Sequence, residues 1–254
     1  MKFIWVFNGA KLKQYFVILM AAIFAIGIAY AEQQNIAVFT QTSKAPAAIY
    51  KVETDQKKLA LTFDISWGEH RAAPILDILE QKGVKKATFF LSAEWSKEHP
   101  DIVKRILKQG YEIGSHGYKH INYSRLTDDE IRQQIRKADT VLQEVTGKKP
   151  NLIRTPNGDI DKRVLQIADE LNYTVIQWDT DSKDWLNPGV EQIVHNVVSH
   201  AHPGDIILLH ASDSSKQTHL ALPTIIDQLK GKGYEFTSVS ELIADAKVKA
   251  KEID

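Results

Sequence analysis

Short apolar runs alternate along the chain with longer segments in which apolar residues recur every three or four positions. The runs are rich in β-branched and aromatic residues, a composition that favours strands. They comprise residues 59–63, 87–91, 111–115, 152–153, 174–178, 205–209 and 234–237. The longer segments have the period of amphipathic helices, and they comprise residues 72–81, 100–109, 127–145, 162–171, 190–199, 222–230 and 240–246.

Strands this short and this continuously apolar are typical of a parallel sheet covered by helices. About seven strand–helix units in roughly 200 residues predict a deformed parallel (β/α) barrel, with a doubly wound open sheet as the alternative. The loop after the first run, residues 64–68, carries no glycine-rich phosphate-binding signature. Thr127 and Glu130 form a capping box at the start of the longest predicted helix, and Gly147 ends it.

The first 31 residues have a different pattern from the rest of the chain. Lys2, Lys11 and Lys13 precede an apolar stretch, residues 15–31, that ends in Ala29-Tyr30-Ala31. This arrangement predicts a signal peptide, or an uncleaved signal anchor in the membrane, and a domain exported to the outside of the cytoplasmic membrane. The predicted organisation is a signal segment over residues 1–31, a linker or arm over residues 32–55 and a domain over residues 56–250.

The composition narrows the classes of function. The chain has 32 basic and 32 acidic residues, so no excess of positive charge points to a nucleic-acid partner. It contains no cysteine, which excludes disulfides, a thiolate metal site and a cysteine nucleophile. We therefore expect a monomer that does not bind nucleic acid.

Polar residues stand just past the ends of the predicted strands. They are Asp64, His116, Arg154, Asp181, Asp184 and His210. In a parallel barrel these strand ends open on one face, where active sites are built, so we expect the side chains to converge there. Taken singly, each residue has a simpler interpretation as a turn cap, a solvated charge or a semi-buried histidine. Their matching positions favour an active site.

His116 and His120 lie four positions apart in the sequence Ser-His-Gly-Tyr-Lys-His. If the backbone turns helically there, both imidazoles lie on one face, and two such groups make up most of a zinc site. The alternative is a pair of surface histidines on a polar loop. The spacing alone leaves both interpretations open.

Five ordered motifs resemble those of the polysaccharide deacetylases, the carbohydrate esterase family 4 or NodB-homology domain. The motifs are Thr62-Phe63-Asp64, His116-Gly-Tyr-Lys-His120, Arg154-Thr-Pro156-Asn-Gly158, Asp181-Ser-Lys-Asp184-Trp185 and Leu208-Leu209-His210. The N-terminal segment and the Phe-Asp-Ile-Ser-Trp-Gly variant of the first motif resemble the sporulation-associated, PdaB-like branch. The resemblance implies a deformed (β/α) barrel that removes N-acetyl groups from peptidoglycan or a related aminosugar polymer, in spore cortex or cell-wall maturation.

The resemblance also implies catalytic roles for four residues. Asp64 is the base that takes a proton from water, and Arg154 holds Asp64 in place. His210 is the acid that protonates the departing amine. Asp184 fixes the tautomer of His210 and favours its protonated form.

Metal and substrate contacts follow from the same resemblance. His116 and His120 hold a divalent metal, Zn²⁺ or alternatively Co²⁺. The backbone N–H near Asn157 contacts the oxyanion. Trp185 and Pro156 form walls of the pocket that takes the acetyl methyl group.

Ile65 stands where the family ordinarily has a second aspartate, the third metal ligand. Water, Asp64 or Glu69 are the alternatives for that third place, so we expect weak metal binding and low or absent turnover. The alternative function is a weakly active or inactive deacetylase-like protein that binds polysaccharide. Trp67 and Trp95 are candidates either for stacking on sugars or for the core.

Overall fold

The structure is a computed structural model that describes Met20, residues 46–244 and the backbone of residues 247–251. The chain divides into two units, Met1–Lys44 and Ala45–Asp254, and the second contains the domain described below. The predicted signal segment, apart from Met20, and most of the predicted linker lie outside the described residues. No helix in the described part combines the length and the apolar character needed to span a membrane.

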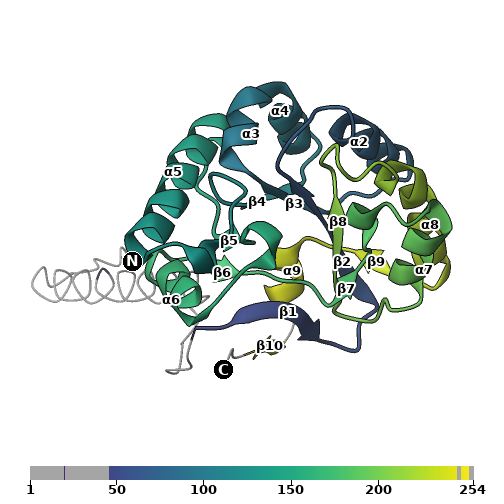
Figure 1. The fold of residues 1–254 in the computed structure, drawn as a ribbon. Coiled ribbons are helices and arrows are strands. Elements are labelled where there is room, and N and C mark those ends of the chain that lie inside the picture. The colour runs from purple at the N-terminus through teal and green to yellow at the C-terminus, as the bar shows by residue number, and fades with distance from the viewer. Residues whose placement is uncertain (1–19, 21–45, 245–246, 252–254) are drawn as a thin grey trace, which may run out of the picture. The chain divides into compact units, whose positions relative to one another are not determined.

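A curved row of parallel strands forms the centre of the domain, with helices along its outer side (Figure 1). The neighbour order is β6-β5-β4-β3-β2-β8-β7, and β9 pairs with the first residues of β2. The strands are β2 (Lys58–Ile65), β3 (Thr88–Leu91), β4 (Glu112–Ser115), β5 (Leu152–Ile153), β6 (Thr174–Val175), β7 (Thr180–Asp181), β8 (Ile206–His210) and β9 (Glu235–Phe236). The prediction of a deformed (β/α) barrel is confirmed, and the doubly wound alternative is not.

All seven predicted helical segments contain a helix, and Ala93–Glu98 is an additional helix that was not predicted. The helices are α2 (Ala72–Gln81), α3 (Ala93–Glu98), α4 (Pro100–Lys108), α5 (Asp128–Thr146), α6 (Lys162–Glu170), α7 (Val190–Val198), α8 (Thr218–Gly231) and α9 (Val239–Ala244). The capping box of α5 is present, because the Thr127 hydroxyl accepts from the Glu130 N–H and the Glu130 carboxylate accepts from the Thr127 N–H. Short 3₁₀ turns η1 (Tyr123–Arg125), η2 (Pro156–Gly158) and η3 (Asp184–Leu186) follow β4, β5 and β7.

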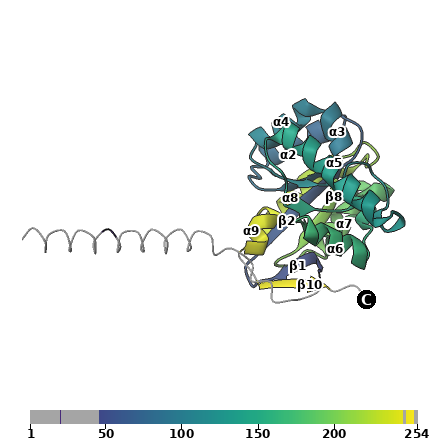
Figure 2. The ribbon, with the colours of Figure 1, turned by 90° about the vertical axis from the view of Figure 1, so that its left-hand side faces the viewer.

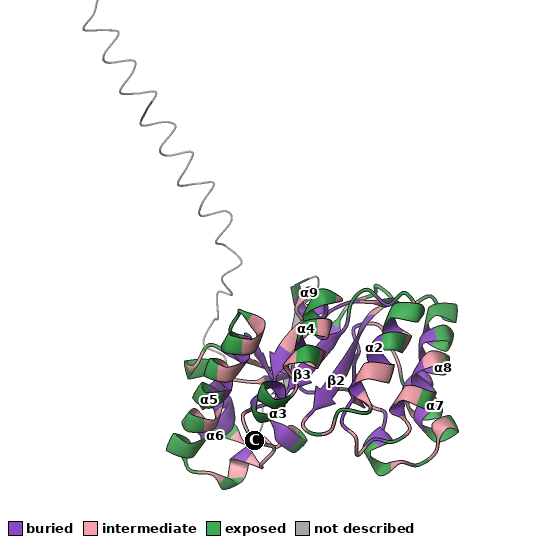
Figure 3. Ribbon diagram, turned by 90° about the horizontal axis from the view of Figure 1, so that it is seen from above, coloured by how far each residue is buried: buried purple, intermediate pink, exposed green. Residues whose placement is uncertain are grey.

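The two faces of β2 differ in character, and this difference positions the site. One face belongs to the core cluster shared with the helices, and its residues are Leu59, Leu61, Phe63 and Ile65. Successive side chains of a strand point to opposite faces, so Thr62 and Asp64 point into the barrel. Seen from above, the strands are buried while the outer surfaces of the helices are exposed (Figure 3).

Part of the predicted linker forms a strand. β1 (Ala48–Glu53) pairs antiparallel with β10 (Lys247–Lys251), and the two lie side by side (Figure 2). Ile49 and Val52 are buried, and the Val52 N–H donates to the Gly204 carbonyl over 2.9 Å. Residues 48–53 are therefore packed against the domain and are not a loosely attached arm. Their partner strand lies at the far end of the chain, so no local sequence pattern indicated the pairing.

Candidate active site

The carboxyl ends of the strands surround a pocket of about 390 Å³. Many of the residues predicted for the site line it, namely Asp64, His116, His120, Asn157, Asp181, Trp185 and His210. Arg154 and Asp184 are fully buried and contact the pocket through Asp64 and His210. The structure thus brings together the polar residues that follow the predicted strands.

Pro156 was predicted to form a wall of the pocket, but the structure does not place it there. Its side chain is buried in η2 and is not part of the lining. The neighbouring Gly158 and the Trp178 ring line that side instead. The prediction followed the motif, which does not say which of its residues turns toward the pocket.

Asp64 forms a buried ion pair with Arg154. Nη1 of Arg154 donates to Oδ1 of Asp64 over 2.8 Å. The Arg154 side chain is 0% exposed and the Asp64 side chain is 6% exposed. Nη1 also donates to the Thr62 hydroxyl, and Nη2 donates to the Gln177 carbonyl. The guanidinium carbon lies 4.3 Å from the centre of the Phe90 ring. These contacts hold Asp64 in one orientation.

Asp64 is ionised despite its burial. Burial by itself raises the pKa of Asp64, but the Arg154 guanidinium opposes this effect most strongly, followed by His116 and His210. The net result is a pKa below the usual value for aspartate. Asp64 therefore presents a carboxylate to the pocket over the whole neutral range.

His116 and His120 lie on a loop, so the helical turn considered for this stretch is not present. Gly117 between them has a φ of +75°, and a Cβ there would lie 2.3 Å from the Tyr123 hydroxyl, so only glycine fits. The turn still brings the two imidazoles together, with ring centroids 5.4 Å apart. The loop therefore places both imidazoles close enough together to be considered as a pair of metal ligands.

Both histidines have a neutral ring. His116 Nδ1 donates to the Arg154 carbonyl over 2.7 Å, because a carbonyl only accepts, and this leaves the lone pair on Nε2. That Nε2 lies 3.8 Å from Oδ2 of Asp64. Burial lowers the pKa of His116, and burial together with the neighbouring His116 lowers the pKa of His120 to about 4. Neutral imidazoles fixed by a second hydrogen bond are the form that binds metal.

His210, whose side chain is 21% exposed, forms a second pair with the fully buried Asp184. Oδ1 of Asp184 accepts from Nδ1 of His210, and Oδ2 accepts from the His210 backbone N–H and the Thr218 hydroxyl, each over 2.7 Å. Burial works against a charged ring, but Asp184, with a smaller contribution from Asp64, raises the pKa of His210 above its usual value. Because Nδ1 is bound to Asp184, Nε2 is the nitrogen available to a ligand.

Side chains that the sequence reasoning missed complete the lining. They include Ser66, Trp178, Ser212 and Ser214. Ser212 follows His210 by two positions, and the same reasoning about strand ends would have found it. Of the two tryptophans considered for sugar binding, Trp67 lines the pocket, whereas Trp95 is buried in the core.

Two neutral imidazoles and one carboxylate at the pocket are ligand types that bind a divalent metal. His116 and His120 supply nitrogen, and Asp64 is the carboxylate beside them, a donor set that zinc accepts. Glu69 does not join them, because its carboxylate lies 3.8 Å from Nδ1 of His99 and outside the pocket lining. Ile65 is fully buried and does not line the pocket.

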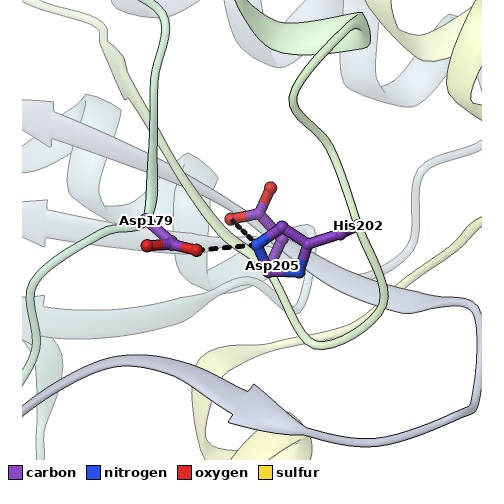
Figure 4. Close-up of side chains that lie close together, drawn as sticks. All are labelled: Asp179, His202 and Asp205. Atoms are coloured by element: carbon purple, nitrogen blue, oxygen red, sulfur yellow. Dashed lines mark hydrogen bonds and ion pairs between the residues drawn. The ribbon is translucent and has the colours of Figure 1, made fainter.

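A second group of ligand-type side chains lies at the opposite ends of the strands. Asp179 and Asp205 precede β7 and β8, and their carboxylates face His202 (Figure 4). The ligand atoms of the three residues lie within 4.8 Å of one another, a spacing that could hold a metal. However, the Lys51 ammonium lies 2.8 Å from the same Asp179 oxygen that contacts His202. We interpret the group as an ion-pair network that fastens β1 to the barrel.

Known proteins are similar to this chain in sequence and in fold. The family model of polysaccharide deacetylase matches residues 51–176. A peptidoglycan-N-acetylglucosamine deacetylase of Bacillus cereus is 38% identical over 198 residues, which are 76% of this chain and 70% of that protein. The peptidoglycan-N-acetylmuramic acid deacetylase PdaA of Bacillus subtilis is 30% identical over 206 residues, 80% of this chain and 77% of that one.

A solved structure agrees with these similarities. BA3943 of Bacillus anthracis, a pseudoenzyme of carbohydrate esterase family 4, superposes with a TM-score of 0.73 and 36% identity, over 78% of this chain and 69% of that one. The residues that the family model matches include Asp64, His116, His120 and Arg154. The chain belongs to the polysaccharide deacetylase family.

Proposed function

We propose that the protein is a metal-dependent deacetylase that hydrolyses the N-acetyl groups of peptidoglycan aminosugars. Two ion pairs carry this proposal, because Asp64–Arg154 and His210–Asp184 present a base and an acid to one pocket. Hydrolysis of an amide needs both, since water must lose a proton and the departing amine must gain one. Relatives named as peptidoglycan deacetylases support the class of substrate.

The two ion pairs have different roles in the proposed hydrolysis, one in accepting a proton and one in donating it. Asp64 is ionised because of Arg154, so it can accept the proton of the attacking water. His210 is biased toward its charged form by Asp184, so it can donate a proton to the amine nitrogen as the C–N bond breaks. His116 and His120 would hold a divalent metal, which would supply polarisation of the acetyl carbonyl and of the water.

For the metal we propose Zn²⁺, with Co²⁺ as the alternative, bound weakly. Oδ2 of Asp64 lies 3.8 Å from Nε2 of His116, but Asp64 also pairs with Arg154 and serves as the base. Ile65 adds no ligand atom. A donor shared in this way should hold metal less tightly than three dedicated ligands, so activity should depend on added metal.

Acetate release is the direct test. The purified full chain is incubated with N-acetylated peptidoglycan in the presence of a chelator, of Zn²⁺ or of Co²⁺, and free acetate is measured. We expect acetate with metal only, and about 10²–10⁴-fold less from Asp64→Asn. Mass spectrometry of the digested product then shows whether N-acetylglucosamine or N-acetylmuramic acid has lost its acetyl group. The absence of acetate under every metal condition would reject the activity.

A second candidate function is polysaccharide binding with little or no turnover. Ile65 at the position of the third ligand favours it, and so does the structural similarity to the pseudoenzyme BA3943. Sedimentation of the chain with insoluble peptidoglycan, without acetate release, would support this function over the first.

We also propose that the protein acts outside the cytoplasmic membrane, in the cell wall or spore envelope, as a monomer of the PdaB-like branch. The lysines and the apolar stretch within residues 1–31 support export, and residues 15–31 would anchor the protein if they are not cleaved. Fractionation of growing cells and spores with an antibody tests the location. Recovery of the full-length chain in the cytosol would contradict it.

A further inference from the structure

Trp67 is a large apolar side chain that remains in water at the edge of the pocket. It lies on the loop between β2 and α2, lines the pocket and is 45% exposed. Its ring meets the His120 ring at a centroid distance of 4.9 Å, with the two planes at 86°. The indole is thus fixed beside a proposed metal ligand while nearly half of its surface stays open.

The backbone around Trp67 is held by neighbouring side chains. Nε1 of Trp95 donates to the Gly68 carbonyl over 2.7 Å. The Ser66 N–H donates to the Ser212 hydroxyl over 2.8 Å. Trp95 is itself buried in the core, so the loop is tied to a rigid part of the domain.

Asp213 closes the same loop from the other side. Its N–H donates to the Trp67 carbonyl over 3.2 Å, and its carboxylate accepts from the N–H groups of Glu69 and Arg71 over 3.2 and 2.9 Å. Gly68 has a φ of +81°, and a Cβ there would come within 2.2 Å of the Asp213 side chain. These contacts restrain the loop backbone on both sides of Trp67 and so support the position of its ring beside His120.

Packing of the fold alone does not explain why the Trp67 ring is exposed at the pocket. A tryptophan that only stabilised the fold would be buried, as Trp95 is, because exposing the ring forfeits the free energy of burial. An exposed aromatic ring at the mouth of a polar pocket is instead typical of a ligand-binding surface. A pyranose ring has an apolar face of C–H bonds that packs on an indole, while its hydroxyl and N-acetyl groups remain free to hydrogen-bond around it.

We propose that Trp67 is a stacking platform that holds one pyranose ring of an aminosugar chain on the imidazole side of the pocket. The proposal rests on the proposed function for the class of ligand, and it adds the residue that holds the chain. Trp185, on η3, lines the same pocket and is also exposed. Two indoles are thus available to a ligand longer than a single sugar.

Calorimetric titration of the full chain with the tetramer of N-acetylglucosamine tests the platform, with a chelator present to prevent turnover. We expect Trp67→Ala to weaken binding by about three- to tenfold, the range for one aromatic contact. Trp67→Phe keeps a ring and should bind nearly as the wild type does. Leu220→Ala is the matched control, since Leu220 is an exposed apolar residue of α8 outside the pocket lining.

Trp67→Leu separates stacking from simple apolar contact, because leucine offers apolar surface without a ring, and it should bind as weakly as Trp67→Ala. Melting temperatures of all variants show that they are folded. Equal binding by the wild type and Trp67→Ala would overturn the platform, and so would a wild-type chain that does not bind the tetramer. Binding that depends on Trp67 without acetate release would leave the platform standing and reject the activity.

Discussion

Asp64 on β2 and His210 on β8 are direct partners across the parallel register. Residues opposite each other in a strand pair point to the same face of the sheet, so the register places the proposed base beside the proposed acid. The Ala211 N–H donates to the Asp64 carbonyl over 3.0 Å and extends the pairing past the end of β8. A shift of one residue would turn one of the two side chains toward the helices, so the site depends on this register.

We expect Asp64→Asn and His210→Ala each to reduce acetate release by about 10²–10⁴-fold, the usual loss when a positioned acid or base is removed. Asp227→Asn is the control, because the Asp227 carboxylate pairs with Lys82 at the surface, away from the pocket. Thermal melts confirm that each variant is folded. Turnover close to that of the wild type in either site variant would remove that residue from the mechanism.

Arg154→Met should lower the free energy of unfolding by about 3–5 kcal/mol, because it leaves the Asp64 carboxylate buried without its cation. Denaturant titration measures the loss. Adding Asp64→Asn to this variant should recover part of the stability, since a neutral amide needs no counter-charge. If the double variant is no more stable than Arg154→Met, the ion pair is not the source of the loss.

Gly114→Ala should be destabilising although the substituted residue lies away from the pocket lining. Gly114 stands opposite Phe90 in the register of β3 and β4, and a Cβ there would lie 2.5 Å from two atoms of the Phe90 ring. That ring packs against the Arg154 guanidinium, so its displacement should disturb the Asp64 pair as well. We expect a loss of roughly 1–3 kcal/mol in unfolding experiments. Phe90→Leu in the same chain should relieve the clash, and an unchanged loss would contradict this explanation.

In the metal-free protein the pKa of His210 should lie above the usual histidine value and the pKa of His120 below it. His210 keeps its proton above its usual pKa because of Asp184, so the stability it adds is complete below pH 6.5 and is lost as the pH rises through its folded pKa. Burial lowers the pKa of His120 to about 4, so its contribution is lost as the pH falls from 6.5 toward 4. Ring resonances followed by NMR give both midpoints. Asp184→Asn should lower that of His210 only, and coincident midpoints in the wild type would contradict the assignment.

The sequence predicted those features that depend on local pattern. Apolar runs identified the strands that carry Asp64, Arg154 and His210, and the ends of parallel strands meet on one face whatever the loops do. The capping box at Thr127 was readable because it is complete within four residues. The convergence of the polar residues followed from these local facts and the fold class together.

Features that depend on distant contacts could not be read in this way. The strand β1 needs β10, almost two hundred residues later, to pair with. The loop from His116 to His120 depends on the space that the Tyr123 hydroxyl leaves for Gly117. Trp67 and Trp95 are the same residue type and differ only in their tertiary contacts. The sequence therefore left both as candidates for packing in the core or for stacking on a sugar.

Ile65 follows Asp64 on β2 and points to the other face of the strand. It stands opposite Leu91 of β3, and both residues are fully buried in the core cluster shared with the helices. Neither lines the pocket. A carboxylate introduced at position 65 would therefore lie in the apolar layer between strand and helices, and not on the face of β2 that carries Asp64.

We expect Ile65→Asp to lower the stability of the metal-free protein by several kcal/mol, because it buries a charge without a partner. The new carboxylate would also lie next to Asp64 in the chain, and repulsion between the two would raise the pKa of one of them. Leu91→Asp is the matched control, because it places the same group in the same layer one strand away. Calorimetry and thermal melts of both variants, with and without Zn²⁺, should show similar losses and no gain in zinc affinity. A recovery of stability with Zn²⁺ in Ile65→Asp alone would show that the carboxylate reaches His116 and His120, and would assign position 65 to the metal site.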